Sequence, residues 1–217
     1  MRPSARHHVR RVKERARYET AAVQAVLDAG FLAHVGFCVD GQPFVIPMLY
    51  ARDGEDILLH GSIASRLMRS LADGIAACVS VTHVDGLVLA RSHFHHSANY
   101  RSAVCFGTAR VVDDAQEKAA ALARFVDAIL PGRAAESRAA DRNELAATLL
   151  LRFTIEDASA KVREGGPRDD PADTGLPVWA GVVPLQMRST APIPAEDCAL
   201  PLPPSVQRLT AANGDAA

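Results

Sequence analysis

Between residues 31 and 39, apolar side chains recur at every second position, which is the period of a β-strand with one buried face. Further apolar runs follow at 44–50 and 57–60. The pairs Asp40-Gly41 and Asp53-Gly54 separate the three runs, and Asp-Gly is a strong signal for a tight hairpin turn. The pattern predicts a three-stranded antiparallel meander. The first strand would turn inward Phe31, Ala33, Val35, Phe37 and Val39.

Four more β-rich runs follow later in the chain. Residues 75–82 and 87–93 predict two strands joined by a hairpin at Asp85-Gly86. The apolar runs at residues 100–112 and 148–155 predict two further strands. Every connection between these runs is typical of antiparallel pairing.

Helical spacing is confined to three stretches. Residues 19–29 carry apolar side chains at helical intervals and end at Gly30, residues 62–72 do so with a spacing of four, and residues 114–130 form the longest such run. A parallel sheet would need a helix in each crossover, and too few helices are present for that. The order of elements predicts a β-rich α+β fold built as a small closed or nearly closed antiparallel barrel with peripheral helices.

Composition favours one domain with appendages. The chain has 217 residues, of which 48% are hydrophobic, enough to bury one sizeable core. We expect a domain over residues 18–187, a basic N-terminal arm over 1–17, and a Pro/Ala-rich tail over 188–217 that is mobile unless it packs on a partner subunit. The formal net charge of −1 gives no reason to expect nucleic acid or an anionic membrane as partner.

Several functional classes lose their usual signals. The four cysteines include no C-x-x-C pair, and neither a phosphate-binding P-loop, a G-x-S-x-G elbow nor a G-x-G-x-x-G fingerprint occurs. No apolar run reaches eighteen residues, so we expect a cytoplasmic protein. His93 and His95 would share a strand face, but no Asp or Glu stands beside them in sequence, so no dedicated metal site is expected.

The first candidate for chemistry runs from the third predicted strand into the short helix. Glycine allows close backbone approach, two hydroxyls can donate hydrogen bonds, and arginine offers a fork of donors, which together suit a phosphate group. An equally weighted alternative makes Ser62 a helix cap and Arg66 a solvated helix residue. The residues concerned are His60, Gly61, Ser62, Ser65 and Arg66.

Two other segments carry candidate ligand contacts. Proline in a strand is usually confined to an edge, so Pro47 indicates free backbone that a flat aromatic ligand could face beside Ile46, Met48 and Tyr50; a barrel edge with core Met and Tyr is the favoured alternative. Polar residues between two apolar strands could line a cavity, and the single tryptophan must pack on something. The cavity-lining candidates are Asn99, Arg101 and Ser102; Lys161 and the tryptophan, Trp179, stand in later runs near the C-terminus.

Taken in order, these segments resemble the pyridoxamine 5′-phosphate oxidase-like flavoproteins, in the branch that includes the nitroimidazole-resistance proteins. The resemblance covers about residues 10 to 186. It rests on Ile46-Pro47, His60-Gly61-Ser62 with Ser65-Arg66, the run from Asp85 to Ser92, Ser97 with Asn99-Tyr100-Arg101-Ser102, Ser159-Ala160-Lys161-Val162-Arg163, and Trp179-Ala180-Gly181-Val182 with Pro184.

The resemblance implies an antiparallel split β-barrel, so that residues 18–187 would be an FMN-binding split-barrel domain of a homodimer with the flavin at the interface. Ser65 and Arg66 would hold the phosphate, the ring would lie near Ile46 and Pro47 with Met48 and Tyr50 beside it, and a second group would complete the site: Asn99, Tyr100, Arg101 and Trp179. Relatives often have lysine after the Ser-Arg pair, where this chain has Leu67. Phosphate binding would then depend more on Arg66, Arg69 or Lys161.

The activity implied is that of an FMN-dependent oxidoreductase, because a bound flavin supplies hydride or electron transfer itself. We expect a small organic acceptor such as a nitro compound or quinone. His60, Arg101 and Lys161 could stabilise a reduced flavin or an anionic substrate, and His60 is a candidate catalytic proton donor. No basic site for pyridoxamine phosphate is identified. The alternative is a non-enzymatic flavin or haem binder, with iron ligands offered by His93, His95 and His96.

Overall fold

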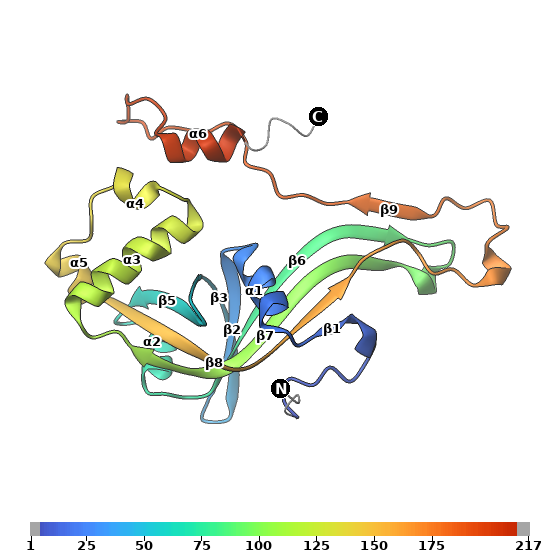
Figure 1. Ribbon diagram of the computed structural model, residues 1–217, viewed down its shortest axis with the longest axis horizontal. Helices are drawn as coiled ribbons and strands as arrows, with labels where there is room; N and C mark the ends of the chain where they lie inside the picture. The colour runs from blue at the N-terminus through green and yellow to red at the C-terminus, as the bar shows by residue number, and fades with distance from the viewer. Residues whose placement is uncertain (1–4, 212–217) are drawn as a thin grey trace.

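One antiparallel sheet organises the molecule. The computed structural model describes residues 5–211, and its nine strands follow the order β3-β2-β6-β7-β8-β5-β4, with β1 on β8 and β9 on β6 (Figure 1). The β-rich α+β prediction is confirmed. The strands are β1 Ala16–Arg17, β2 Leu32–Val39, β3 Gln42–Leu49, β4 Ala51–Asp53, β5 Asp56–Ser62, β6 Ala77–Leu89, β7 Ser97–Val111, β8 Thr148–Arg163 and β9 Gly181–Pro184.

The sheet curls around a core but does not close. Its two ends, β3 and β4, are neighbours in the chain but pair only with β2 and β5 respectively, which is the geometry of a split barrel. Two helices each pack one side against this core: α1, Thr20–Asp28, and α2, Arg66–Ala72. Their buried residues belong to the same cluster as the inward side chains of the strands, including Val23, Leu27, Leu67, Leu71 and Val35.

A second, smaller core lies on the other side of β4, β5 and β8. Helix α3, Ala115–Ile129, buries Ala121 and Phe125 against Leu58 and Leu150. Successive strand residues point to opposite faces, so β5 serves both cores: Ile57 and Leu59 enter the barrel, and Leu58 faces α3. Two short helices follow, α4 at Arg133–Glu136 and α5 at Arg142–Ala147.

Beyond the barrel, β6 and β7 continue as a long two-stranded hairpin with β9 along one side (Figure 1). We call residues 83–101 the hairpin extension. The two strands predicted at 75–82 and 87–93 are one strand, β6, and the predicted hairpin at Asp85-Gly86 is wrong. The register between β6 and β7 shifts there instead, as in a β-bulge. A Cβ on Gly86 would lie 3.1 Å from the carbonyl oxygen of Val183, so the glycine admits β9 rather than a turn.

The hairpins at Asp40-Gly41 and Asp53-Gly54 are confirmed, because β2 pairs with β3 and β4 with β5. The predicted three-stranded meander is wrong, because the two hairpins are not neighbours in the sheet. Strand β5 pairs with β8 along its whole length, and β3 pairs only with β2. The edge position of β3 explains how Pro47 is tolerated within a strand. The second helix begins at Arg66 rather than at residue 62, because Ser65 caps it.

Both ends of the described chain are docked. At the N-terminal end, Arg6 forms ion pairs with Glu156 and Asp157. Short 3-10 helices occur elsewhere in the chain, at Lys13–Arg15, His93–His95 and Pro171–Asp173. The tail ends in α6, Pro204–Ala211, which rests beside α4 through Ser205 and Glu136 (Figure 1). Residues 204–211 thus form a helix held by a specific hydrogen bond, while the mobility expected of the tail stays a prediction. Residues 1–4 and 212–217 of the predicted arm and tail lie outside the described residues.

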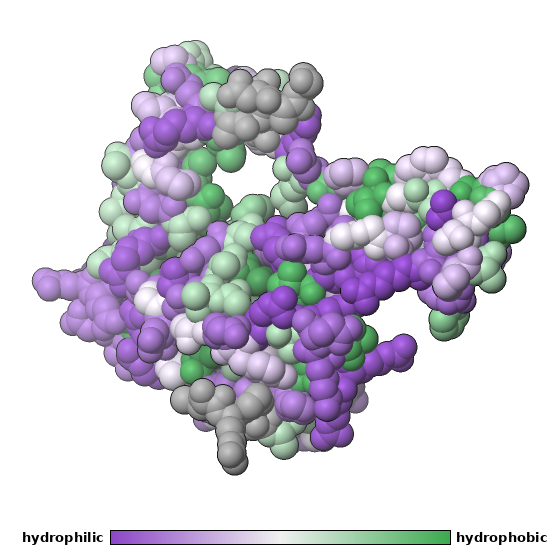
Figure 2. Space-filling model, turned by 45° about the vertical axis from the view of Figure 1, so that its right-hand side comes forward, coloured by the Kyte–Doolittle hydropathy of each residue, from purple (hydrophilic) through white to green (hydrophobic). Residues whose placement is uncertain are grey.

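Two surfaces remain open. The outward side of β2, β3 and β6 leaves large apolar residues exposed, among them Leu32, Val45, Leu49 and Val84. Figure 2 shows, in addition, an open passage between the C-terminal segment and the body of the protein. Among residues 5–211, none of the helices is long and apolar enough to cross a membrane.

Candidate functional site

The turn between β5 and α2 is shaped by its two serines. The Ser62 hydroxyl accepts a hydrogen bond from the Ala64 amide at 3.1 Å, and the Ser65 hydroxyl accepts one from the Met68 amide at 3.4 Å. Ser65, rather than Ser62, is therefore the helix cap. A Cβ on Gly61 would lie 2.9 Å from Cγ of Met68, so this glycine lets the helix pack closely on the strand.

Arg66 points from the first turn of α2 to the edge strand β3. Its guanidinium carbon lies 4.0 Å from the centre of the Phe44 ring, a cation–π contact. Within residues 5–211 no carboxylate pairs with it, so its hydrogen-bond donors remain available to an anion. The neighbouring Arg69 instead donates to the Ala64 carbonyl at 3.3 Å.

The residues of β3 divide between its two faces. Phe44 and Met48 contact the barrel core, with the partly exposed Ile46 on the same side of the strand, and Pro47 points outward. Tyr50 is 1% exposed, and its hydroxyl donates to the Leu27 carbonyl. Burial raises the pKa of Tyr50. In this chain Tyr50 is thus a core residue with no surface to offer a flavin ring.

His60 lies on the α3 side of β5, away from the barrel interior. Its ring meets Phe125 edge-on at a centroid distance of 4.4 Å, and no hydrogen bond to it occurs within residues 5–211. Burial lowers the pKa of His60, which favours the neutral imidazole. This geometry separates His60 from Ile46 and Pro47, with which it was expected to share a ligand.

The polar residues of the hairpin extension and of the adjoining parts of β7 and β8 are held by hydrogen bonds within the chain. Arg101 forms two hydrogen bonds with Asp85, at 2.8 and 3.0 Å, and this contact lowers the pKa of the carboxyl. The Asn99 side-chain oxygen accepts from Arg163, and the Ser102 hydroxyl donates to the Lys161 carbonyl at 3.4 Å.

Tyr100 and Trp179 complete the predicted set. Tyr100 lies opposite Arg163 in the β7–β8 ladder and is partly buried. Trp179 is 65% exposed beside β9, where its ring would lie 2.9 Å from a Cβ on Gly181. The packing expected for the tryptophan is thus incomplete within one chain.

The predicted residues therefore form three groups rather than one pocket. One group surrounds Arg66, one is His60 with α3, and one lies along the hairpin extension. Sequence reasoning missed Phe44, although its position two residues before Ile46 on the same strand face was a usable signal. It also missed Arg163, whose burial could not be inferred from a polar run.

The structure also corrects one exclusion. The ring of His95 lies near two carboxylates from a later loop, those of Asp170 and Asp173, with ligand atoms all within 4.8 Å of one another. The expectation that no acidic residue accompanies the histidines is wrong in space, because the loop folds back on the hairpin. Asp170 is exposed, and His95 and Asp173 are only partly buried, so the absence of a metal site stays a prediction.

Comparison with solved structures finds strong similarity over almost the whole chain. The flavocytochrome Anf3 from Azotobacter vinelandii is 39% identical over 95% of this chain and 97% of its own, with a TM-score of 0.89. The FAD and haem binding protein from Mycobacterium smegmatis is 42% identical over 90% of this chain and 97% of its own, with a TM-score of 0.87.

A 5-nitroimidazole antibiotic resistance protein described as putative, from Bacteroides thetaiotaomicron, is 18% identical over 68% of this chain and 86% of its own, with a TM-score of 0.58, so it shares the fold. No curated protein matches this chain in sequence. The family model for pyridoxamine 5′-phosphate oxidase matches residues 19–162, from the start of the first helix nearly to the end of β8. The chain therefore belongs to the pyridoxamine 5′-phosphate oxidase family.

Proposed function

We propose that this protein is a homodimeric flavoprotein that also binds haem and transfers electrons between the two groups. The observation that carries the proposal is its similarity, at 39% and 42% identity over nearly the full length, to a flavocytochrome and to an FAD and haem binding protein. The sequence analysis treated flavin-dependent activity and haem binding as alternatives. This proposal combines them in one protein.

The turn around Arg66 fits a flavin phosphate. Ser62 and Ser65 flank a guanidinium that has no carboxylate partner in the described chain, and a phosphate oxygen is the acceptor that such a fork prefers. Ile46 and Met48 would lie beside the ring at the barrel edge. FMN was expected from the sequence, whereas the Mycobacterium relative is described as binding FAD, so we propose FAD and retain FMN as the outcome to be excluded.

A homodimer would bring the separated groups together. The outward side of β2, β3 and β6 exposes the large apolar residues Leu32, Val45, Leu49 and Val84, and clustered exposed apolar residues mark association sites. With a second copy seated there, its hairpin extension would supply Asn99 and Arg101, and the segment before its β9 would supply Trp179, to the flavin of the first. The exposed Trp179 ring would thereby gain its packing partner.

His60 is the histidine of this chain that best fits haem iron. Burial lowers its pKa and so favours the unprotonated ring that ligates iron, no hydrogen bond engages it in the described chain, and it packs against the apolar ring of Phe125. His95 and His96 hydrogen-bond Ser92 through Nδ1, but they lie in an open polar loop.

Flavin and haem would supply the electron-transfer chemistry when bound. The chain itself would hold the flavin phosphate through Arg66, keep His60 unprotonated as an iron ligand, and fix Arg101 through Asp85. Nothing in its residues identifies the acceptor, so reduction of a small organic compound stays a prediction.

The purified protein tests the proposal directly. We expect a flavin absorption band and a Soret band in one spectrum, release of FAD in mass spectrometry, and a dimer in solution scattering. The His60→Ala variant should lose the Soret band and keep the flavin, whereas a His93→Ala/His95→Ala/His96→Ala variant should keep both. A protein that takes up neither cofactor on reconstitution would contradict the proposal, and loss of haem only in the triple variant would remove His60 from the ligand role.

A further inference from the structure

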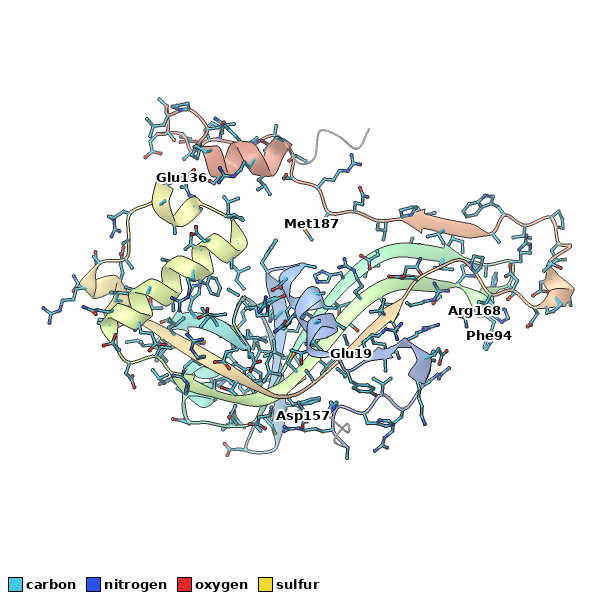
Figure 3. The ribbon with its side chains drawn as sticks, in the orientation of Figure 1. Glu19, Phe94, Glu136, Asp157, Arg168 and Met187 are labelled. Atoms are coloured by element: carbon cyan, nitrogen blue, oxygen red, sulfur yellow. The ribbon has the colours of Figure 1, made fainter. Side chains whose placement is uncertain are left out.

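A pocket of about 210 Å³ lies where the N-terminal segment meets the end of β8. Four arginines line it against two glutamates, and the complete lining is Glu14, Arg15, Arg17, Val162, Arg163, Glu164 and Arg168. Figure 3 labels Arg168 toward the outer end of the hairpin extension. The pocket draws on two stretches of chain that are far apart in sequence, residues 14–17 and 162–168.

Arg163 is the centre of this pocket, and it is 7% exposed. Its guanidinium donates to the side-chain oxygen of Asn99 and to the carbonyls of Gly165 and Gly166, at 3.2 and 3.1 Å for the two carbonyls. All three acceptors are neutral. A buried charge without a counter-charge is costly, so the neutral contacts orient the guanidinium without neutralising it.

The surrounding charges raise that cost. Burial, and after it the neighbouring charges of Arg15 and Arg168, lower the pKa of Arg163. Within residues 5–211 none of the four arginines forms an ion pair with a carboxylate. The charge of Glu164 contributes to raising the pKa of Arg101, which lies outside the pocket lining. Arg17 donates to the backbone carbonyls of Glu14 and Ala16. The lining therefore holds four arginines against the two glutamates Glu14 and Glu164, and within the described residues neither glutamate forms an ion pair with any of the four.

We propose that this pocket binds a phosphate or diphosphate group, held by Arg15, Arg163 and Arg168. Guanidinium forks match the oxygens of phosphate, and an anion with several negative charges can engage three arginines at once. The cavity is smaller than the ~300–1,000 Å³ of whole-cofactor sites, so it suits an ionic group rather than a flavin or a porphyrin. The basic N-terminal segment thus acquires a role that composition alone did not assign.

The site is tested with inorganic pyrophosphate, which needs neither flavin nor haem to report. Isothermal titration of the full protein should show binding that the variants Arg15→Ala and Arg168→Ala each weaken about tenfold or more. Arg163 is left intact in these variants because its buried contacts support the fold. Arg110→Ala, which removes one exposed charge from β7, should bind pyrophosphate as the wild type does. Equal affinity in all four proteins, or no binding by the wild type, would overturn the proposal.

A second titration identifies the source of the anion. If the Arg168→Ala variant weakens FAD binding but not FMN binding, the bound group is the diphosphate of the dinucleotide. If both flavins bind as before while pyrophosphate binding is lost, the group belongs to a separate ligand. Both results support the site, and failure of flavin binding altogether leaves the pyrophosphate result unaffected.

Discussion

The guanidinium of Arg66 lies 4.0 Å from the centre of the Phe44 ring, and this contact links the first turn of α2 to the free edge of the sheet. The aromatic face orients the arginine without using its hydrogen-bond donors. The arrangement holds a charged fork beside Ser62 and Ser65 and leaves it available to a ligand.

Arg66→Ala should therefore weaken flavin binding about tenfold to a hundredfold, because it removes a charge-assisted contact to phosphate and no core volume. Fluorescence titration with flavin measures the affinity. Arg110→Ala is the matched control, since it removes an exposed arginine distant from this turn in sequence. Wild-type affinity in the Arg66 variant would show that the phosphate lies elsewhere.

Tyr50→Phe should lower the free energy of unfolding by about 1–3 kcal/mol and leave flavin affinity unchanged. The substitution removes the hydroxyl that satisfies the Leu27 carbonyl at the end of α1, in a site closed to water. Urea denaturation gives the stability, and a flavin titration gives the affinity. A stable variant with weakened flavin binding would restore Tyr50 to the ligand site.

Gly86→Val should detach β9 from β6, because even a Cβ there would lie 3.1 Å from both Val182 and the Val183 carbonyl. Faster hydrogen exchange at the amides of residues 181–184 would report the loss of the strand. Gly166→Ala, where nothing lies within 4 Å of the added carbon, should leave this exchange unchanged. Normal protection of β9 in the Gly86 variant would mean that the bulge has another cause.

His60 should make stability depend on pH in the acidic range. Burial lowers its pKa in the folded state below the ordinary 6.5, so below that pH the unfolded chain binds a proton that the folded chain resists. This contribution is complete above pH 6.5 and declines as the pH falls toward the folded-state pKa. The His60→Asn variant should lose less stability over that interval than the wild type, and His34→Asn on the exposed face of β2 controls for removal of an imidazole. Parallel pH profiles for wild type and His60→Asn would contradict the argument.

Glu136→Ala should release α6 from α4. The carboxylate accepts from the Ser205 amide at 2.9 Å and from the Ser205 hydroxyl, and these bonds lower the pKa of Glu136 below its ordinary 4.5. The contact is therefore present above pH 4.5 and is lost as the pH falls through the folded-state pKa. Hydrogen exchange of residues 204–211 measures the release, with Glu55→Gln as an exposed-carboxylate control. Unchanged protection would indicate that the Arg208 contact to the Pro131 carbonyl, at 2.8 Å, is sufficient.

The sequence by itself determined what depends on neighbours along the chain. Alternating residues predicted β2, Asp40-Gly41 and Asp53-Gly54 predicted two hairpins, and apolar spacing predicted α1 and α3 to within one residue at each end. These features follow from local backbone geometry and from which side of an element is apolar. The family resemblance rested on the same local motifs, and the family model match confirms it.

Only the tertiary structure decided what depends on segments distant in sequence. Pairing of β5 with β8, the conversion of Asp85-Gly86 from a turn into a bulge by β9, and the burial of Arg163 against Asn99 join residues about 60 to 100 positions apart. Local periodicity cannot fix such pairings, because many registers bury the same apolar face and only the packed whole selects one. For the same reason, the sequence could identify candidate site residues, but it could not predict that they lie in three separate groups in the folded chain.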